Sequence, residues 1–181
     1  MTILVPLADG VEELEAITII DVLRRADLSV TTASLTDENQ IKGAHGILIQ
    51  TDSTLNELSP DEFGAIVLAG GGEGTDNLMQ DPHIIKTVQI LNEQNKYVCA
   101  ICAAPSILAA AGVLDGLKAT CYPTCAETLG ASYTDVPVVV DNNIITSQGP
   151  GTALLFSLVL VQHFADEKTA STVAKEMLTT M

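Results

Sequence analysis

Short apolar stretches alternate along the chain with longer stretches in which apolar residues recur every three or four positions. The first pattern predicts buried β-strands, and the second predicts amphipathic helices. Strands are expected within residues 2–8, 28–35, 43–52 (a strand or a small hairpin), 64–68, 97–101, 118–121 and 136–148. Helices are expected within residues 9–26, 81–95, 103–112, 152–164 and 165–178. This alternation predicts a single α/β domain over residues 1–181, with a doubly wound, mostly parallel sheet and helices on both faces.

Two loops between a strand and a helix stand out in this pattern. The segment "LAGGGEG" includes the end of the strand at Leu68, and the strand ending at Ile101 runs directly into "CAAP". In doubly wound sheets, ligands bind beyond the carboxyl ends of the strands, where such loops lead into helices. The glycines can bring backbone N–H groups close to a ligand oxygen, although they can also simply form a tight turn.

The charge balance excludes some classes of partner. The net charge is −15, from 23 acidic and 8 basic residues. Nucleic acids and anionic membrane surfaces are bound through clustered Lys and Arg, so neither is expected as a partner. The longest apolar stretch, residues 152–164, is too short to span a bilayer, and no basic leader precedes the first strand. A cytoplasmic location is therefore expected.

The four cysteines allow more than one interpretation. Cys99, Cys102, Cys121 and Cys125 have a spacing close to that of a structural zinc site, and the first two have the spacing of a dithiol redox centre. Cys99, however, lies within an apolar strand, whereas a dithiol centre begins at a helix N-terminus. We interpret Cys99 as a buried apolar residue and expect no metal ion.

Cys102 lies where an apolar strand turns into a helix, among small alanine neighbours. This is the pattern of a nucleophile elbow, in which a tight turn lifts a reactive side chain above the sheet. The first free N–H groups of the helix would face the sulfur and stabilise a thiolate. The alternative is a structural thiol in a turn.

A carboxyl group on the first helix is a candidate partner for this thiol. Glu15 shares a stripe at helical spacing with four apolar residues. These are Val11, Ile19, Val22 and Ala26. Burial on this stripe would raise the pKa of Glu15 and favour a protonated acid that can donate a hydrogen bond to a thiolate, although the side chain could also reach solvent. Glu12 and Glu13 fall off the stripe and are expected to be solvated.

Together, these segments resemble the DJ-one/ThiJ/PfpI superfamily, specifically its parkinsonism-associated deglycase branch. The segments "GVEELEAITIIDVLRRA", "VLAGGGEGTDNL", "AICAAPSILAAAG" and "TSQGPGTA" occur in the family's order over essentially the whole chain. The resemblance implies a flavodoxin-like fold, no cofactor, and a homodimer with the first helix near the interface. It also implies that Cys102 is the elbow cysteine, Glu15 the protonated acid beside it, and the N–H groups of Gly71 and Ala103 the oxyanion or anion pocket.

Three positions depart from the family pattern. Ala103 stands where the protease-like branch has a histidine, which argues against peptidase activity. Tyr122 stands where some deglycase-branch members have a histidine, and His45 stands where some members have an arginine near the pocket. No histidine is therefore expected beside the thiol.

The resemblance implies an enzyme that acts on small dicarbonyls such as methylglyoxal, or on early glycation adducts. Cys102 would form a hemithioacetal with the aldehyde, and Glu15 would shuttle the proton. The second hypothesis is an oxidative-stress sensor or holdase-type protein, whose low-pKa Cys102 is oxidised to sulfenic and then sulfinic acid.

Overall fold

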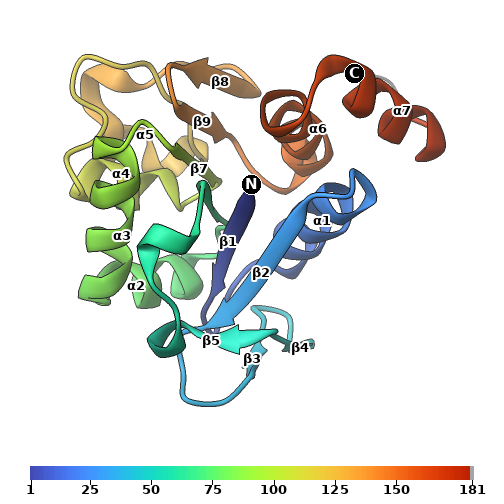
Figure 1. The fold of residues 1–181 in the computed structure, drawn as a ribbon. Helices are drawn as coiled ribbons and strands as arrows, with labels where there is room; N and C mark the ends of the chain where they lie inside the picture. The colour runs from blue at the N-terminus through green and yellow to red at the C-terminus, as the bar shows by residue number, and fades with distance from the viewer. Residues whose placement is uncertain (180–181) are drawn as a thin grey trace.

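The computed structural model describes residues 1–179. Seven strands form one sheet in the order β5-β2-β1-β6-β7-β9-β8 (Figure 1). They are β1 (Thr2–Leu7), β2 (Ser29–Ser34), β5 (Ser53–Thr54), β6 (Ala65–Leu68), β7 (Tyr97–Ile101), β8 (Val138–Asp141) and β9 (Ile144–Ser147). All neighbouring pairs are parallel except β8 and β9, which are antiparallel at one edge. The predicted mostly parallel, doubly wound sheet is confirmed.

Helices cover both faces of this sheet (Figure 1). One layer consists of α1 (Glu13–Arg25), α6 (Ala153–Phe164) and α7 (Glu167–Glu176), and the other of α2 (Gly72–Gln80), α3 (Pro82–Glu93), α4 (Pro105–Ala110) and α5 (Ala126–Leu129). Short 3₁₀ helices, η1 to η5, span Leu55–Glu57, Pro60–Glu62, Pro123–Cys125, Gly130–Ser132 and Pro150–Thr152. Among the described residues, no helix combines the length and apolar character needed to cross a membrane.

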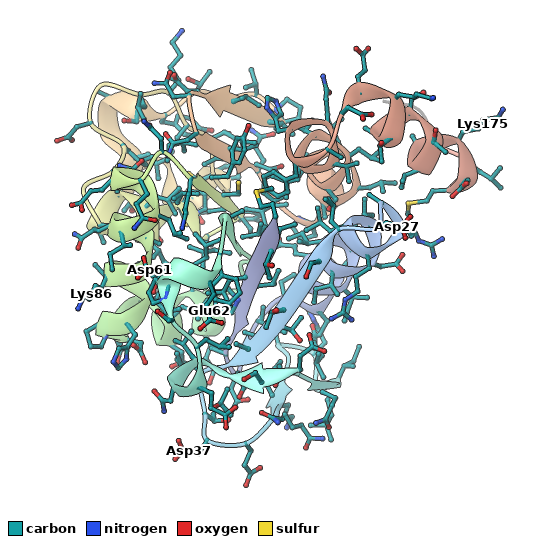
Figure 2. All side chains as sticks on the ribbon, in the orientation of Figure 1. Asp27, Asp37, Asp61, Glu62, Lys86 and Lys175 are labelled. Carbon is teal, nitrogen blue, oxygen red and sulfur yellow. The ribbon has the colours of Figure 1, made fainter. Side chains whose placement is uncertain are left out.

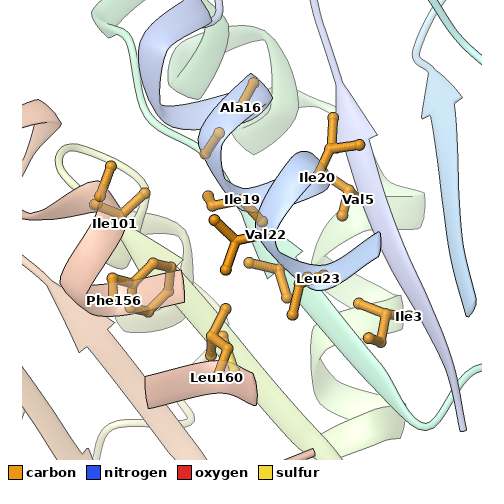
Figure 3. Packing of buried hydrophobic residues seen from close by; sticks show 14 of the residues in the cluster. Ile3, Val5, Ala16, Ile19, Ile20, Val22, Leu23, Ile101, Phe156 and Leu160 are labelled. Atoms are coloured by element: carbon orange, nitrogen blue, oxygen red, sulfur yellow. The ribbon is translucent and has the colours of Figure 1, made fainter. Parts of the chain in front are cut away.

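The core beneath the first layer is built from aliphatic side chains around one aromatic ring. Figure 3 shows Phe156 and Leu160 of α6 beside Ile19, Val22 and Leu23 of α1, and all five are fully buried. Burying one such side chain contributes about 1.5–3 kcal/mol. This packing holds α1, and with it the candidate residue on its first turn, firmly against the sheet.

A small hairpin lies outside the main sheet, below the start of α1 (Figure 1). It consists of β3 (Gln40–Lys42) and β4 (Leu48–Gln50). A strand or small hairpin was predicted within residues 43–52, and the hairpin begins three residues earlier. The N–H of Gly10 donates to Lys42 O at 2.8 Å, and the N–H of Ala44 donates to Val11 O at 2.9 Å. The hairpin is thereby anchored to the loop that leads from β1 into α1.

Two local predictions differ from the structure. Residues 118–121 do not form a strand, since only an isolated bridge joins Ala119 to Tyr133. The helix α2 was not predicted, because its glycine-rich sequence has the composition of a loop and glycine is a weak helix former.

Candidate active site

Cys102 lies at a sharp turn between β7 and α4. Its φ of 65° is in the left-handed region, which residues other than glycine rarely adopt. Its N–H donates to Ser147 O at 3.0 Å, and its carbonyl accepts from the N–H of Tyr122 at 2.8 Å. The strand-turn-helix geometry expected of a nucleophile elbow is present, and its main chain is fixed from two sides.

Glu15 reaches this turn from the first turn of α1. It has no exposed surface, so the alternative of a solvated side chain is excluded. The N–H of Gly70 donates to its Oε2 at 2.8 Å, while Oε1 is buried without a hydrogen-bond partner among the described residues. The carboxyl group therefore keeps one free oxygen in the immediate neighbourhood of the Cys102 thiol.

The Glu15 carboxyl group and the Cys102 thiol each change the pKa of the other. Burial raises the pKa of Glu15 to about 7, while the Gly70 N–H bond and the nearby Cys102 side chain act in the opposite direction. Burial and the Glu15 carboxylate raise the pKa of the Cys102 thiol to about 12, although N–H groups of Gly71 and Ala103 donate to the sulfur and act in the opposite direction. At neutral pH the pair therefore holds a neutral thiol beside an acid that is only partly ionised.

This result corrects the expectation of a thiol with a lowered pKa. The sulfur is buried next to a carboxylate, and α4, which begins only at Pro105, has six residues and offers a short dipole. The N–H groups of Gly71 and Ala103, which were predicted to form an anion pocket, lower the thiol pKa but do not outweigh burial and the Glu15 charge.

The glycine loop is a place of close approach as well as a turn. A Cβ on Gly70 would lie 2.6 Å from Cys102 Cβ and 2.8 Å from Glu15 Oε2. Gly71 has a φ of 92°, and a Cβ there would meet the backbone of Gly10 and Glu12. Because both positions are glycine, the loop after β6 can pack directly against the start of α1 and against the turn at Cys102.

Glu13 was expected to be solvated, and this expectation is wrong. Its side chain is buried, and its Oε1 accepts the backbone N–H of His45 at 2.7 Å. Its Oε2 lies 2.8 Å from Nδ1 of His45. Although burial acts in the opposite direction, the contacts with His45 and Ile47 lower the pKa of Glu13 to about 2. The partner of Glu13 comes from the hairpin, so the helical stripe could not reveal it.

His45, on this hairpin, is largely exposed and lies close to the start of α1. Contact with Glu13, together with the charge of Glu12, raises its pKa. The other two histidines have local partners: His83 contacts Asp81, and His163 packs its ring edge against Tyr97. Tyr122, by contrast, adjoins the elbow through its backbone N–H.

In the described part of the chain, the remaining cysteines do not form a set of metal ligands with Cys102. Cys99 is fully buried within β7, as predicted, and Cys121 and Cys125 pack in the other helical layer. The one group of potential metal ligands found among residues 1–179 is Glu12, Glu13 and His45, so the four-cysteine set is not brought together there. The spacing that resembled a zinc site was misleading, because Cys99 and Cys102 pack on one side of the sheet and Cys121 and Cys125 on the other.

Comparisons with known proteins agree with this fold. The model of the family described as "DJ-1/PfpI family" matches residues 1–163. Protein dj-1beta of Drosophila melanogaster is 37% identical over 178 residues, which cover 97% of this chain and 95% of that protein. Protein DJ-1 homolog B of Arabidopsis thaliana is 38% identical over 164 residues, which cover 90% of this chain but 37% of the relative. The solved structure described as Toxoplasma gondii DJ-1, oxidized, matches with a TM-score of 0.96 at 31% identity, over 99% of both chains.

Proposed function

Because this chain belongs to the DJ-1/PfpI family and has its flavodoxin-like fold, we propose that it is a cofactor-free enzyme of the glyoxalase or deglycase type. Its substrates are methylglyoxal-type dicarbonyls or early glycation adducts, and its nucleophile is Cys102. The observation that carries this proposal is the free Oε1 of Glu15 beside the elbow thiol, with Oε2 held by Gly70. This arrangement provides a nucleophile and a base at fixed positions.

In the first step, the sulfur of Cys102 attacks the aldehyde carbon. The thiol proton passes to the Glu15 carboxylate, and the pKa of about 7 allows this group to exist as a base at neutral pH. The oxygen of the former carbonyl becomes negative and accepts hydrogen bonds from the N–H groups of Gly71 and Ala103. Glu15 then gives the proton to this oxygen, which completes the hemithioacetal and restores the carboxylate.

In the second step, the Glu15 carboxylate takes the proton from the hemithioacetal carbon and returns it to the adjacent carbonyl carbon, while the hydroxyl proton of the hemithioacetal moves to the neighbouring carbonyl oxygen. The product is a 2-hydroxyacyl thioester on Cys102, and attack by water releases the hydroxy acid and restores the thiol. For methylglyoxal, the sum is one aldehyde plus one water giving lactate. With an early glycation adduct of the hemiaminal type, the sulfur displaces the amine from the carbon that carries it, and the thiol proton passes through Glu15 to the leaving nitrogen. The same hemithioacetal results, and it continues through the second step.

The test is turnover of methylglyoxal to lactate by purified variants. Cys102→Ser and Glu15→Gln should each lose at least about a hundredfold in kcat/KM. The matched control is Cys125→Ser, which removes a thiol from the other helical layer and should keep full activity. Full conversion by Cys102→Ser would refute the proposal.

A second function is favoured by the same unpartnered oxygen. If Cys102 is oxidised by peroxide, a protonated Glu15 can donate a hydrogen bond to a sulfinate oxygen, and Gly71 and Ala103 can donate to another. The relative from Toxoplasma gondii is described as oxidized. A sensor would show oxidation of Cys102 at low peroxide, detected by mass spectrometry of intact protein, without repeated turnover of aldehydes.

We also propose that the chain forms a homodimer through α1 and the hairpin. Four large apolar side chains are exposed there: Leu14 and Ile17 on α1, and Ile47 and Leu48 at the start of β4. These four residues are called the α1–hairpin patch below. Exposed apolar groups gathered on neighbouring elements are typical of protein interfaces.

A further inference from the structure

The helical layer that contains α3 is incomplete. Between β5, at the edge of the sheet, and β6, the chain crosses over β2 and β1 with only the short 3₁₀ helices η1 and η2 (Figure 1). Such crossovers usually carry a full α-helix that covers the sheet. Between these short helices and α3 lies a cavity of about 320 Å³, which reaches Leu4 on β1. It belongs to the opposite helical layer from Cys102.

The wall of this cavity combines an apolar floor with a basic rim. Leu4, Leu55 and Phe63 form buried apolar surface, while His83 and Lys86 of α3 lie at the exposed side. No carboxylate of residues 1–179 lines the cavity, although the chain has 23 acidic residues. The lining therefore offers a lysine and no acidic side chain, although His83 contacts Asp81 at 3.1 Å outside the cavity wall.

The nearby polar groups leave Lys86 available to a ligand. Lys86 takes part in none of the ion pairs formed within the described chain. Asp61 and Glu62, on η2 beside the cavity, already accept hydrogen bonds, from the Gln94 side chain and from the N–H of Ser59 respectively. Figure 2 shows Lys86 on the same side of the molecule as these two acids.

We propose that this cavity binds a small carboxylic acid with a compact apolar body, such as a short aliphatic or aromatic acid. The apolar part contacts Leu55 and Phe63, and the carboxylate pairs with Lys86. Pockets of about 300 Å³ or more with an apolar lining and a few polar groups are typical small-molecule sites. The site does not depend on Cys102, so it stands or falls separately from the proposed catalytic function.

The test is an NMR titration of ¹⁵N-labelled protein with hexanoate and phenylacetate, with hexan-1-ol as the uncharged match. Saturable shifts are expected in residues 55–63 and 83–90, with hexanoate binding more tightly than the alcohol. Lys86→Met, which keeps the apolar stem, should weaken hexanoate binding at least about fivefold. Lys175→Met, on the opposite side of the molecule (Figure 2), should not change it. Ile90→Phe should fill the cavity and abolish binding in a folded protein.

Three results would overturn the proposal. These are the absence of saturable shifts in the two segments, equal affinity for hexanoate and hexan-1-ol, and hexanoate binding that Lys86→Met leaves unchanged. Shifts confined to the loops around Cys102 would assign the acid to the catalytic pocket and would equally contradict a site beside α3.

Discussion

At the scale of single residues, the buried carboxyl group of Glu15 links the candidate active site to stability. Its pKa of about 7, against an ordinary value of 4.5, means that the folded protein holds this proton more tightly than the unfolded chain does. The free energy of unfolding should therefore fall as pH rises from 4.5 through 7, by on the order of 3 kcal/mol, and remain lower at higher pH.

Glu15→Gln removes this titration while keeping an oxygen that can accept from Gly70. Relative to the wild type, the variant should gain stability between about pH 5 and about pH 8. Urea denaturation of both proteins at the two pH values measures the difference. An unchanged difference would show that Glu15 has an ordinary pKa.

The glycine loop offers a second residue-scale prediction with a matched control. Gly70→Ala places a methyl group against Cys102 and Glu15, so it should separate the pair, slow the alkylation of Cys102 and destabilise the protein by about 1–3 kcal/mol. Gly72→Ala adds the same methyl group where no atom lies within 4 Å, at the start of α2, and should be neutral or slightly stabilising. Alkylation kinetics and thermal unfolding distinguish the two, and equal effects would contradict the close approach at Gly70.

Single residues also show which features of the candidate site could be predicted from the sequence. The stripe of α1 predicted the burial of Glu15, and the apolar run before Cys102 predicted the elbow. The backbone bonds that fix Cys102, to Ser147 and Tyr122, come from segments 20 or more positions away and have no sequence signal. The raised pKa of the thiol was missed for a related reason, because it depends on how deeply the folded chain buries both acids.

At the scale of secondary-structure elements, the Glu13 carboxylate holds the turn of the hairpin, in addition to the backbone bonds described above and the bond from the Lys42 N–H to Asp9. Glu13→Ala leaves the backbone N–H groups of His45 and Ile47 without their acceptor, which should cost about 1–3 kcal/mol. Faster amide hydrogen exchange in residues 40–50 would report the loosening. His45→Ala keeps these backbone bonds and removes only an exposed contact, so it should change stability by less than about 1 kcal/mol. Equal losses in both variants would contradict this role for Glu13.

The elements were predicted well where periodicity and end signals agree, and poorly where glycine interrupts them. The strands β6 and β7 are short apolar runs, which is typical of buried parallel strands. The helix α2 was missed because its sequence is rich in glycine; it is held by contacts with the loop after β1, such as the bond from the Gly74 N–H to Gly10 O. Residues 118–121 form no ladder of their own, and the N–H groups of residues 118–120 donate instead to Asp141, Ser132 and Thr146.

At the scale of the whole molecule, the α1–hairpin patch predicts the oligomeric state. Ile17→Glu combined with Leu48→Glu places charges in the proposed interface and should convert the dimer to a monomer in sedimentation velocity. Val140→Glu changes an exposed apolar residue on the edge strand β8 and should leave the mass unchanged. A wild-type protein that sediments as a monomer would contradict the interface.

The main-chain anchoring of Cys102 has a consequence for signalling. Both of its backbone hydrogen bonds run to other segments, and neither involves the sulfur. An adduct or an oxidised sulfur therefore changes charge and volume at one point while the path of the chain stays in place. The state of this thiol would therefore change the local electrostatic potential and not the fold. A partner that responds to it would have to bind next to Cys102.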